Sequence, residues 1–452
     1  MKIVFFVHCF FPDHFYGTET YTLGLANHYR SWGHEVSVVS AVFQGEAKQP
    51  SLINRYSYQD IPVIAIDKNV IPHSRVKETY YQPEMRNVLE EILLELKPDV
   101  IHVTHLINHT SVLLEVAGKL NIPTYTTFTD FFGFCANNKL EAADGGLCAG
   151  PSESRANCVA CYLKEAAQGG HATGWMKKAA VPAMANLLAK GLVASRKLGA
   201  LKSGSTQGLV EDLVTRPDTL SYLYNTYYKG AVAPTAFLQK AYIANNITAP
   251  MRKIWFGIDI DRKAKPVRDE NHIPVIGFIG QIAPHKGTDL LIEAFKQQPK
   301  NSARLKIYGP TDQSVSYMDT LRKMSDGVDG IEFMGTFDQA KMADIFSEID
   351  LFVIPSRWYE NSPLVLLNSL ATHTPVLVSD VEGMTEFLTE GVNGYSFKRG
   401  NSDDLANKLS YILQTPQLLH KLSLSTEYAR TTEVMAKETF EIYQCNELIT
   451  NS

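Results

Sequence analysis

The chain has 452 residues, of which 45% are hydrophobic and 20% are charged. This balance is ordinary for a globular protein, excludes a disordered or fibrous chain, and gives enough length for about two to three domains. Lys and Arg number 43 against 48 Asp and Glu, a formal net charge of -5. Because no overall positive field is present to hold a nucleic acid, we expect no nucleic-acid partner.

The first part of the chain alternates short β-branched or aromatic runs with helical patterns. Expected strands cover residues 3–7, 35–40, 63–66, 100–104 and 124–128, and expected helices cover 18–32, 83–96 and 111–120. Such alternation predicts a parallel, doubly wound sheet. The opening apolar run meets His8 and then Pro12 with no small-residue cleavage site, so it predicts a buried strand rather than a signal peptide. No apolar run reaches the ~20 residues of a membrane span, and we expect a cytoplasmic protein.

A second alternating series predicts a second α/β domain. Its expected strands cover 274–280, 304–308, 331–334, 351–355 and 375–379. Residues 262–271 are charged, contain Pro266 and lack apolar periodicity, as a linker does. We therefore expect Rossmann-like domains at 1–262 and 273–425, and a helical segment at 426–452 that packs back on the first domain.

An insertion at about 131–218 interrupts the first domain and contains a cluster of cysteines. The cluster consists of Cys135, Cys148, Cys158 and Cys161. A Cys-x-x-Cys pair with two further cysteines in a loop-rich segment fits a tetrahedral thiolate site, most often structural zinc. Four reduced or disulfide-bonded cysteines are the alternative. We expect the two isolated cysteines, Cys9 and Cys445, to be buried apolar thiols.

The same insertion contains a basic helical stretch. Residues 171–204 include no acidic residue and carry Lys177, Lys178, Lys190, Arg196, Lys197 and Lys202. Trp175 and several leucines and valines lie between these cations. The pattern of 175–202 suits a helix lying on an anionic membrane surface and equally a solvated helix face, so peripheral contact with the inner face of a membrane is one of two readings.

The window 354–368 follows an expected strand and opens a helix. Ser362 is a good N-cap and Pro363 fits the first helical position, so the N–H groups of Leu364 and Val365 are expected to be free. Free N–H groups at a helix start form an anion site. Because ligands of open α/β sheets collect at the carboxyl ends of strands, Glu360 is placed beside that site.

Residues 280–287 make a similar connection after the first strand of the second domain. Lys286 precedes a helix, where the helix dipole opposes a cation, and a bound phosphate would offset that repulsion. A solvent-facing lysine is the alternative. The spacing is not that of a phosphate-binding P-loop, and no Gly-x-Gly-x-x-Gly follows either first strand. In the first domain Gly17 leaves room for a ligand to approach the backbone, although a glycine in such a turn is more often steric punctuation.

These motifs resemble those of the retaining glycosyltransferases of family 4, which have the two-Rossmann GT-B architecture with the domains facing a cleft. The matching segments are 276–280 with Lys286-Gly287, Pro355-Ser356 with Trp358 and Glu360, 374–376, 391–394, 233–235, 256–259 and 33–36. A subset of family 4 also has a similar four-cysteine cluster after the same strand.

The resemblance implies a nucleotide-sugar donor site and a glycan or lipid-linked acceptor. Lys286 would bind the donor diphosphate, Glu360 would lie beside the donor sugar, and the turn at Gly17 and Thr18 would face the phosphate. Further donor contacts fall on Gly280, Gln281, Ser362, Leu364, Val365 and Asn368. A helix N-terminus and a lysine stabilise charge on a departing diphosphate, so no protein nucleophile is demanded. The acidic pair of Asp259 and Asp261 lies in the family's Gly-Ile-Asp signature, and we expect no catalytic metal.

Several residues depart from the family pattern. Asn368 stands where a second glutamate usually meets the ribose, and Gln281 replaces an arginine. Thr129-Asp130 replaces a His-Asp pair, and Asp130 is either a sugar contact, counted among the catalytic candidates, or a turn residue. The leading hypothesis is a glycosyltransferase of surface-polysaccharide or glycoconjugate assembly. A non-catalytic homologue that binds nucleotide-sugar or glycan is its rival, and a phosphorylase or epimerase on the same fold is less favoured.

Overall fold

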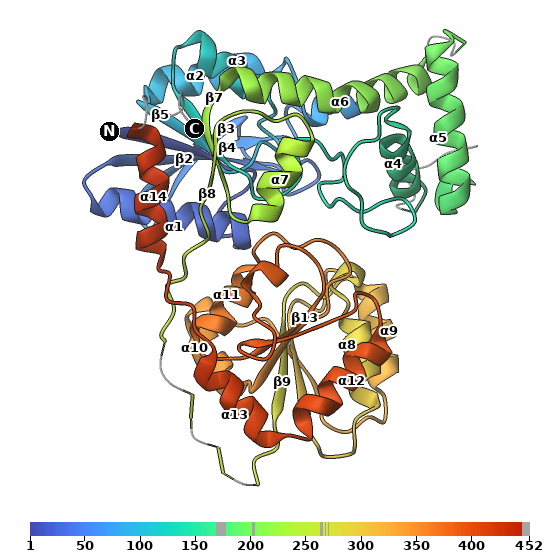
Figure 1. Cartoon of the computed structure of the whole chain (residues 1–452). Coiled ribbons are helices and arrows are strands. Elements are labelled where there is room, and N and C mark those ends of the chain that lie inside the picture. The colour runs from blue at the N-terminus through green and yellow to red at the C-terminus, as the bar shows by residue number, and fades with distance from the viewer. Residues whose placement is uncertain (169–177, 201–203, 263–264, 267, 270, 445–452) are drawn as a thin grey trace. The chain divides into compact units, whose positions relative to one another are not determined.

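The computed structural model describes residues 1–168, 178–200, 204–262, 265–266, 268–269 and 271–444 (Figure 1). The chain forms two compact units, Met1–Trp255 with Thr432–Ser452, and Phe256–Thr431. Four residues named in the sequence analysis lie outside the described residues, namely Cys445, Trp175, Lys177 and Lys202. No helix in the described part is long and apolar enough to cross a membrane.

The first unit is built on an eight-stranded sheet in the order β3-β4-β2-β1-β5-β6-β7-β8. Its strands are β1 (Lys2–Phe6), β2 (Glu35–Val42), β3 (Ile53–Tyr58), β4 (Ile61–Asp67), β5 (Val100–Val103), β6 (Thr124–Thr127), β7 (Tyr228–Ala233) and β8 (Met251–Lys253). The strands β1, β5 and β6 are buried almost throughout because helices cover both faces, as in parallel sheets generally. The edge strand β3 is polar, largely exposed and antiparallel to β4, so this sheet is mixed.

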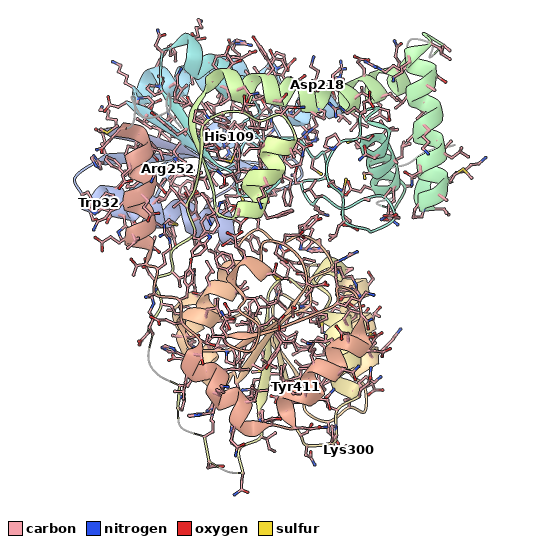
Figure 2. All side chains as sticks on the ribbon, in the orientation of Figure 1. Trp32, His109, Asp218, Arg252, Lys300 and Tyr411 are labelled. Atoms are coloured by element: carbon pink, nitrogen blue, oxygen red, sulfur yellow. The ribbon has the colours of Figure 1, made fainter. Side chains whose placement is uncertain are left out.

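Helices of the first unit include the last one of the chain. They are α1 (Gly17–Ser31), η1 (Val76–Thr79), α2 (Met85–Leu96), α3 (Val112–Lys119), α6 (Ser205–Tyr227), α7 (Ala236–Ala244) and α14 (Thr432–Gln444). The α14 helix packs on α1, where the Tyr29 hydroxyl donates to the Ala436 carbonyl at 3.4 Å. Arg252 of β8 pairs with Glu441 at 3.3 Å (Figure 2). These contacts make α14 a structural part of the first unit.

The insertion forms a helical module with its own small core. Its helices α4 (Ala156–Gln168) and α5 (Pro182–Lys197) lie at the outer end of α6 (Figure 1). Arg155, at the start of α4, pairs with Asp218 of α6 at 2.8 Å (Figure 2). Val193 is buried in the module core, and Leu188 and Leu192 pack against it, so these residues have a packing role. The outward face of α5 therefore contains fewer apolar residues than the sequence pattern predicts.

The second unit contains a six-stranded parallel sheet in the order β11-β10-β9-β12-β13-β14. Its strands are β9 (Val275–Ile279), β10 (Arg304–Tyr308), β11 (Ile331–Gly335), β12 (Leu351–Ile354), β13 (Val376–Ser379) and β14 (Gly394–Phe397). Its helices are η3 (Pro284–Lys286), α8 (Thr288–Lys296), α9 (Val315–Ser325), η4 (Gln339–Lys341), α10 (Met342–Glu348), α11 (Leu364–Ala371), η5 (Thr385–Phe387), α12 (Ser402–Leu413) and α13 (Pro416–Ser425). The predicted α/β class with two Rossmann-like domains is confirmed, with β3 as an antiparallel addition.

The segment 256–262 lies in the second unit, although the sequence places it in the first domain. The Tyr428 hydroxyl donates to the Phe256 carbonyl at 2.5 Å, and the Ile258 N–H donates to the Arg430 carbonyl at 3.1 Å. The Arg262 guanidinium also donates to the Tyr428 carbonyl. The chain passes from the first unit to the second at 255–256 and returns at 431–432. These bonds join the two segments of the second unit that adjoin those positions.

Candidate functional site

The main candidate site lies where β9 and β12 adjoin in the second unit. The strand order reverses between these neighbours, and the crevice beyond their carboxyl ends is where open α/β sheets bind ligands. Lys286 ends η3 after β9, and Glu360 follows β12. Gly287 has φ of +73°, and a Cβ there would lie 2.0 Å from the Pro355 carbonyl oxygen, so this position requires glycine. The close approach packs η3 against the chain that leaves β12.

Lys286 and Glu360 form an ion pair. The Lys286 Nζ lies 2.7 Å from Glu360 Oε1 and 5.1 Å from the centre of the Trp358 ring. Trp358 Nε1 donates to the same oxygen at 2.9 Å, and the Ser356 hydroxyl also donates to it. Within the described residues no hydrogen bond reaches Oε2 of Glu360. The carboxylate is thus held through one oxygen, and the other is available to a ligand.

This arrangement keeps Glu360 ionised although its side chain is only 8% exposed. Burial alone raises the pKa of the carboxyl. The charge of Lys286 and the hydrogen bonds from Lys286, Ser356 and Trp358 outweigh burial, so the pKa of Glu360 lies below its ordinary value. The site therefore holds a fixed negative charge beside a cation with two further N–H donors to offer.

A second ion pair holds the loop that carries Lys286. Arg357 donates to both carboxylate oxygens of Asp289 at 2.6 Å each, and to the Pro284 carbonyl at 2.8 Å. Burial raises the pKa of Asp289, but hydrogen bonds from Arg357 and Tyr317 leave it lowered overall. The sequence did not predict this pair, because 68 positions separate its members and Asp289 lies outside the recognised motifs. A bidentate arginine of this kind fixes geometry as well as charge.

The start of α11 differs from the prediction. Pro363 is the N-cap and Leu364 the first helical residue, so the assignment of Ser362 as N-cap and Pro363 as first residue was wrong. Ser362 has φ of +52°, and its buried hydroxyl has no partner within the described residues. The first regular bond at this end joins the Leu366 N–H to the Pro363 carbonyl at 2.9 Å. The N–H groups of Leu364 and Val365 precede this first bond and make no hydrogen bond within the helix. The anion site expected there therefore keeps its donors.

The other donor candidates of the second unit lie on the same loops. Gly280 follows β9, and its N–H donates to the Tyr308 carbonyl at 3.1 Å, while Gln281 is half-buried beside it. Asn368 lies on α11, half-buried, and its side-chain amide makes no hydrogen bond with the described residues. The structure thus brings Lys286 and Glu360 into contact, and it leaves the Asn368 amide open to a ligand.

Gly17 and Thr18 belong to the first unit, where they open α1. A Cβ at Gly17 would meet no atom within 4 Å, so the space above this turn is open. The Thr18 carbonyl accepts a hydrogen bond from the Thr22 hydroxyl at 2.7 Å. Gly17 is thus exposed, and packing within the described part of the first unit does not require a glycine at this position.

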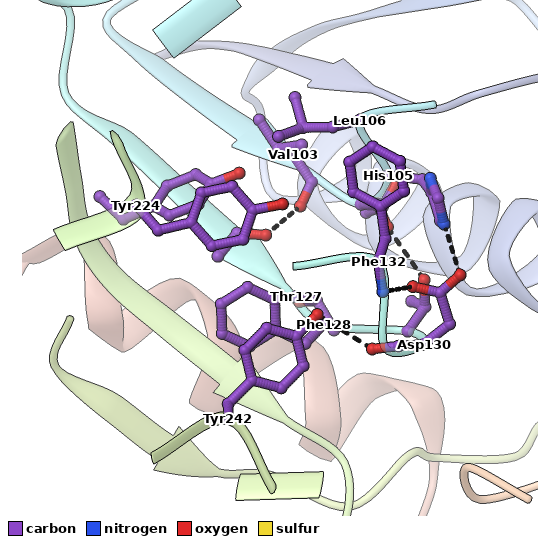
Figure 3. Close-up of a pocket in the computed structure, with 13 residues that line it drawn as sticks. Val103, His105, Leu106, Thr127, Phe128, Asp130, Phe132, Tyr224 and Tyr242 are labelled. Atoms are coloured by element: carbon purple, nitrogen blue, oxygen red, sulfur yellow. Dashed lines mark hydrogen bonds and ion pairs between the residues drawn. The ribbon is translucent and has the colours of Figure 1, made fainter. Parts of the chain in front are cut away.

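Asp130 lines a small pocket of the first unit beyond the ends of β5 and β6 (Figure 3). Its Oδ1 accepts from the Phe132 N–H at 2.8 Å, as a turn aspartate does, and Oδ2 lies 2.9 Å from His105 Nε2. Sequence reasoning missed His105, although it directly follows the predicted strand 100–104. Thr129, next to Asp130, donates its hydroxyl to the Thr104 carbonyl at 3.1 Å. A histidine from the neighbouring strand end therefore stands beside Asp130.

Cys9 is buried as predicted, but its surroundings are polar. Its sulfur donates to Glu19 Oε1 at 3.1 Å, and His8 Nε2 lies 3.2 Å from the same oxygen. Burial, then the charge of Glu19, raises the pKa of the Cys9 thiol, and burial lowers the pKa of His8 well below its ordinary value. The thiol of Cys9 is therefore a protonated hydrogen-bond donor at neutral pH.

The four clustered cysteines, Cys135, Cys148, Cys158 and Cys161, line one pocket of the helical module as free thiols. Burial is the largest cause that raises the pKa of Cys158 and of Cys161 to about 12 each, and the neighbouring thiols add to it. The Gly150 N–H and the Asn157 side-chain amide both donate to the Cys148 sulfur, at 3.4 and 3.7 Å. Four sulfur donors with N–H groups aimed at one of them fit a thiolate metal site in their chemistry.

The spacing of these sulfurs is wider than that of a closed site. Within the described residues, His8, Cys9 and Glu19 form the one group of three ligand atoms that lie within 4.8 Å of one another. The four cysteine sulfurs thus surround their pocket without meeting that spacing. The cysteine side chains would have to rotate for all four sulfurs to bind one ion.

Two α/β units, each with its candidate groups at the carboxyl edge of a largely parallel sheet, define the GT-B class of proteins. Comparison with known families agrees with this class. Residues 259–430 match the family model of glycosyl transferases group 1, and residues 15–139 match that of Glycosyltransferase Family 4. The chain thus contains a group 1 glycosyl transferase domain and a Glycosyltransferase Family 4 domain.

Individual relatives are distant. A D-inositol 3-phosphate glycosyltransferase of Kribbella flavida is 30% identical over 165 residues, which are 34% of this chain and 38% of that protein. An N,N'-diacetylbacillosaminyl-diphospho-undecaprenol alpha-1,3-N-acetylgalactosaminyltransferase of Campylobacter jejuni is 26% identical over 39% of this chain and 42% of that protein. The chain spans 35% to 38% of the length of the first three curated relatives that it matches.

Solved structures extend the fold likeness to the whole chain. A sucrose-phosphate synthase of Thermosynechococcus elongatus has a TM-score of 0.65 at 15% identity, with 98% of each chain covered. The HepE protein of Anabaena in complex with UDP-glucose has a TM-score of 0.62 at 15% identity, with 98% of this chain and 99% of that chain covered. At such identities the likeness establishes the fold alone.

Proposed function

We propose that this protein is a retaining glycosyltransferase that moves a sugar from a nucleotide-sugar donor to a glycan or lipid-linked acceptor in glycoconjugate assembly. The observation that carries the proposal is the Lys286–Glu360 ion pair at the switch point, with the open start of α11 following Glu360 in the chain. The printed names of the relatives, which are glycosyltransferases, and the UDP-glucose complex of HepE support it.

The proposed reaction breaks the bond between the anomeric carbon of the donor sugar and the diphosphate oxygen. A bond from the same carbon to the acceptor oxygen forms on the same face of the sugar, and the proton of the acceptor hydroxyl passes to the departing diphosphate. Negative charge develops on the departing diphosphate, and Lys286 with the N–H groups of Leu364 and Val365 stabilises it. Glu360 faces the sugar through its unpaired oxygen, Asn368 hydrogen-bonds a ribose hydroxyl, and Asp130 meets the acceptor in the pocket of the first unit.

A panel of nucleotide-sugars tests this proposal. Purified protein should bind at least one of them and slowly release the free sugar and nucleoside diphosphate, with the anomeric configuration of the product read by NMR. Binding without any hydrolysis or transfer would favour a non-catalytic partner subunit. The observation on the side of this second candidate is Asn368, whose amide lacks the charge of a ribose-binding carboxylate.

We also propose that the four-cysteine pocket holds a structural zinc ion. Protein purified without a metal-affinity column should contain about one zinc per chain by elemental analysis, because four thiolates bind this ion tightly. Chelation should then make all four thiols titratable in the native protein. Zinc-free protein in which the four thiols already react would contradict the assignment and leave reduced cysteines, as expected in a cytoplasmic compartment.

The proposed lipid-linked acceptor brings the outward face of α5 into the function. Leu187 of α5 is 65% exposed, and Leu198, at the end of this helix, is 82% exposed. Lys190 and Lys197 of the same helix are also exposed. Arg196 instead pairs with Glu211 of α6 at 2.5 Å, so it is part of the module and not of that face. An exposed face with apolar residues and lysines and no carboxylate is suited to an anionic membrane surface.

Changing Lys178, Lys190 and Lys197 together to Gln should abolish binding to anionic vesicles. The wild-type protein should bind them less as salt rises, since each lysine contributes roughly 1 kcal/mol of screened attraction. A control with the same change of charge replaces Lys48, Lys229 and Lys240, which are exposed elsewhere on the first unit. Equal loss in both triple variants, or no vesicle binding by the wild type at low salt, would indicate a solvated helix face.

A further inference from the structure

Arg216 of α6 is a buried cation. It is 2% exposed, and it lies between the rings of Tyr80 and Phe132, with its guanidinium carbon 5.5 and 4.8 Å from their centres. Its Nη2 donates to the Phe132 carbonyl at 2.7 Å, whereas its buried Nη1 has no hydrogen-bond partner within the described residues. A guanidinium in this position has lost its water and has gained only one carbonyl acceptor.

No carboxylate of the described residues pairs with Arg216. On α6, Asp218 pairs with Arg155 at 2.8 Å, and Asp212, one turn before Arg216, already receives two hydrogen bonds from Arg75, at 3.0 and 2.5 Å. Burying an unpaired charge is costly, and structures normally supply an opposite charge or a metal-bound anion. The charge of Arg216 therefore requires an anion other than these carboxylates.

The chain segments that carry the cysteines contact the segment that carries this cation. Cys135 follows Phe132 in a turn closed by a hydrogen bond from its N–H to the Phe131 carbonyl at 2.8 Å, and α4, which carries Cys158, packs against α6. Burial lowers the pKa of Arg216, and negative charge on Cys135, Tyr224, Tyr80 or Cys158 would raise it. The charge of Arg155 lowers the pKa of Cys158, but this arginine already forms an ion pair with Asp218.

We propose that Arg216 is the charge-compensating residue of a metal–thiolate centre formed by the four cysteines. The inference rests on the proposed zinc site and is independent of the transferase activity. Four thiolates around a divalent cation carry a net charge of about -2, of which the guanidinium of Arg216 would offset half. Arg216 is thus a positioning residue of the centre, with its side chain anchored to the Phe132 carbonyl that precedes Cys135.

Zinc affinity of the full-length protein tests this proposal. Arg216→Met fills the space between the two rings with an apolar side chain, Arg216→Gln is a second neutral variant, and Arg216→Lys retains the charge. By competition with a chelator, the Met and Gln variants should bind zinc about 10- to 100-fold more weakly, as losses of outer partners do. Arg216→Lys should lose less than either. The control Arg86→Gln, which breaks an ion pair with Glu115 at 2.6 Å in the same unit, should not alter zinc affinity.

Thermal unfolding provides a second test, because the difference in Tm between wild type and Arg216→Met should depend on whether zinc is bound. With zinc, wild-type protein should gain more in Tm than Arg216→Met. With a chelator, Arg216→Met should unfold at the same temperature as wild type or higher, because the unpaired charge is gone. Equal zinc affinity in wild type and both neutral variants would overturn the proposal, as would the absence of zinc from wild-type protein. If neither neutral variant folds with a chelator present, Arg216 is required for packing, and that result also contradicts it. Donor binding, measured separately, reports on the proposed transferase.

Discussion

Replacing Lys286 by methionine is expected to weaken binding of the nucleoside diphosphate part of the donor by about 10- to 100-fold. The ammonium group would contribute a charge-assisted contact to phosphate worth about 1.5–3 kcal/mol. Lys286 has one of its three N–H donors on Glu360, so two remain for phosphate oxygens. Methionine keeps an apolar stem against Trp358 and removes only the charge. Calorimetric titration of both proteins with the nucleoside diphosphate that the donor screen identifies measures the difference.

Lys306→Met is the matched control for this change. Lys306 lies on β10 of the same unit, and its ammonium group is also 2.7 Å from a carboxylate, that of Glu348. It lies outside the proposed donor site, so its replacement should leave the affinity unchanged. Equal affinities of wild type and Lys286→Met would remove Lys286 from the phosphate site, and equal losses in both variants would indicate a general electrostatic effect.

Glu360→Gln is expected to lower kcat by about 10²- to 10³-fold while donor affinity changes only a few-fold. The amide has the shape of the carboxylate but no charge, and an interaction that acts mainly in the transition state appears in kcat rather than in binding. Steady-state transfer kinetics and direct donor titration separate the two quantities. A variant that retained kcat but lost donor affinity would place Glu360 in ground-state binding alone.

The same variant should change how stability depends on pH. The pKa of Glu360 is lowered in the folded protein, so its contribution to stability is present above the unfolded pKa of about 4.3 and is lost as pH falls through the lower folded value. The difference in free energy of unfolding between wild type and Glu360→Gln should therefore be larger at pH 7 than at pH 3. A difference that did not vary with pH would show that the ion pair adds no linked stability.

Hydrophobic alternation predicted most of the strands and missed β3, β7, β8 and β14. The range 304–308 coincides with β10, because a buried run flanked by polar turns carries a strong signal. β3 is an exposed, polar edge strand, and β7 begins directly where α6 ends, so neither forms a distinct apolar run between turns. The helical segment expected to pack back on the first domain contains α14, which packs on α1.

The candidate site was predictable as a set of residues and less so as a geometry. Motifs identified Lys286 and Glu360, but nothing local indicates that they share an ion pair or that Arg357 braces the loop through Asp289. Ser362 was misassigned because its type favours an N-cap, whereas its backbone is left-handed here. The chain around it is tightly packed, since Gly383, at φ +86°, lies so near the Glu360 carbonyl that a Cβ would stand 1.5 Å from that oxygen. Such constraints arise from tertiary contacts.

Donor binding by the full-length protein is the measurement that tests the central claim most directly. A panel of nucleoside diphosphates and their sugar conjugates is titrated into wild type, Lys286→Met and Lys306→Met. The result expected is saturable binding of at least one nucleotide-sugar to wild type and to Lys306→Met, with affinity about 10- to 100-fold weaker in Lys286→Met. Failure of every nucleotide and nucleotide-sugar to bind the folded wild-type protein would contradict a donor site at Lys286 and Glu360.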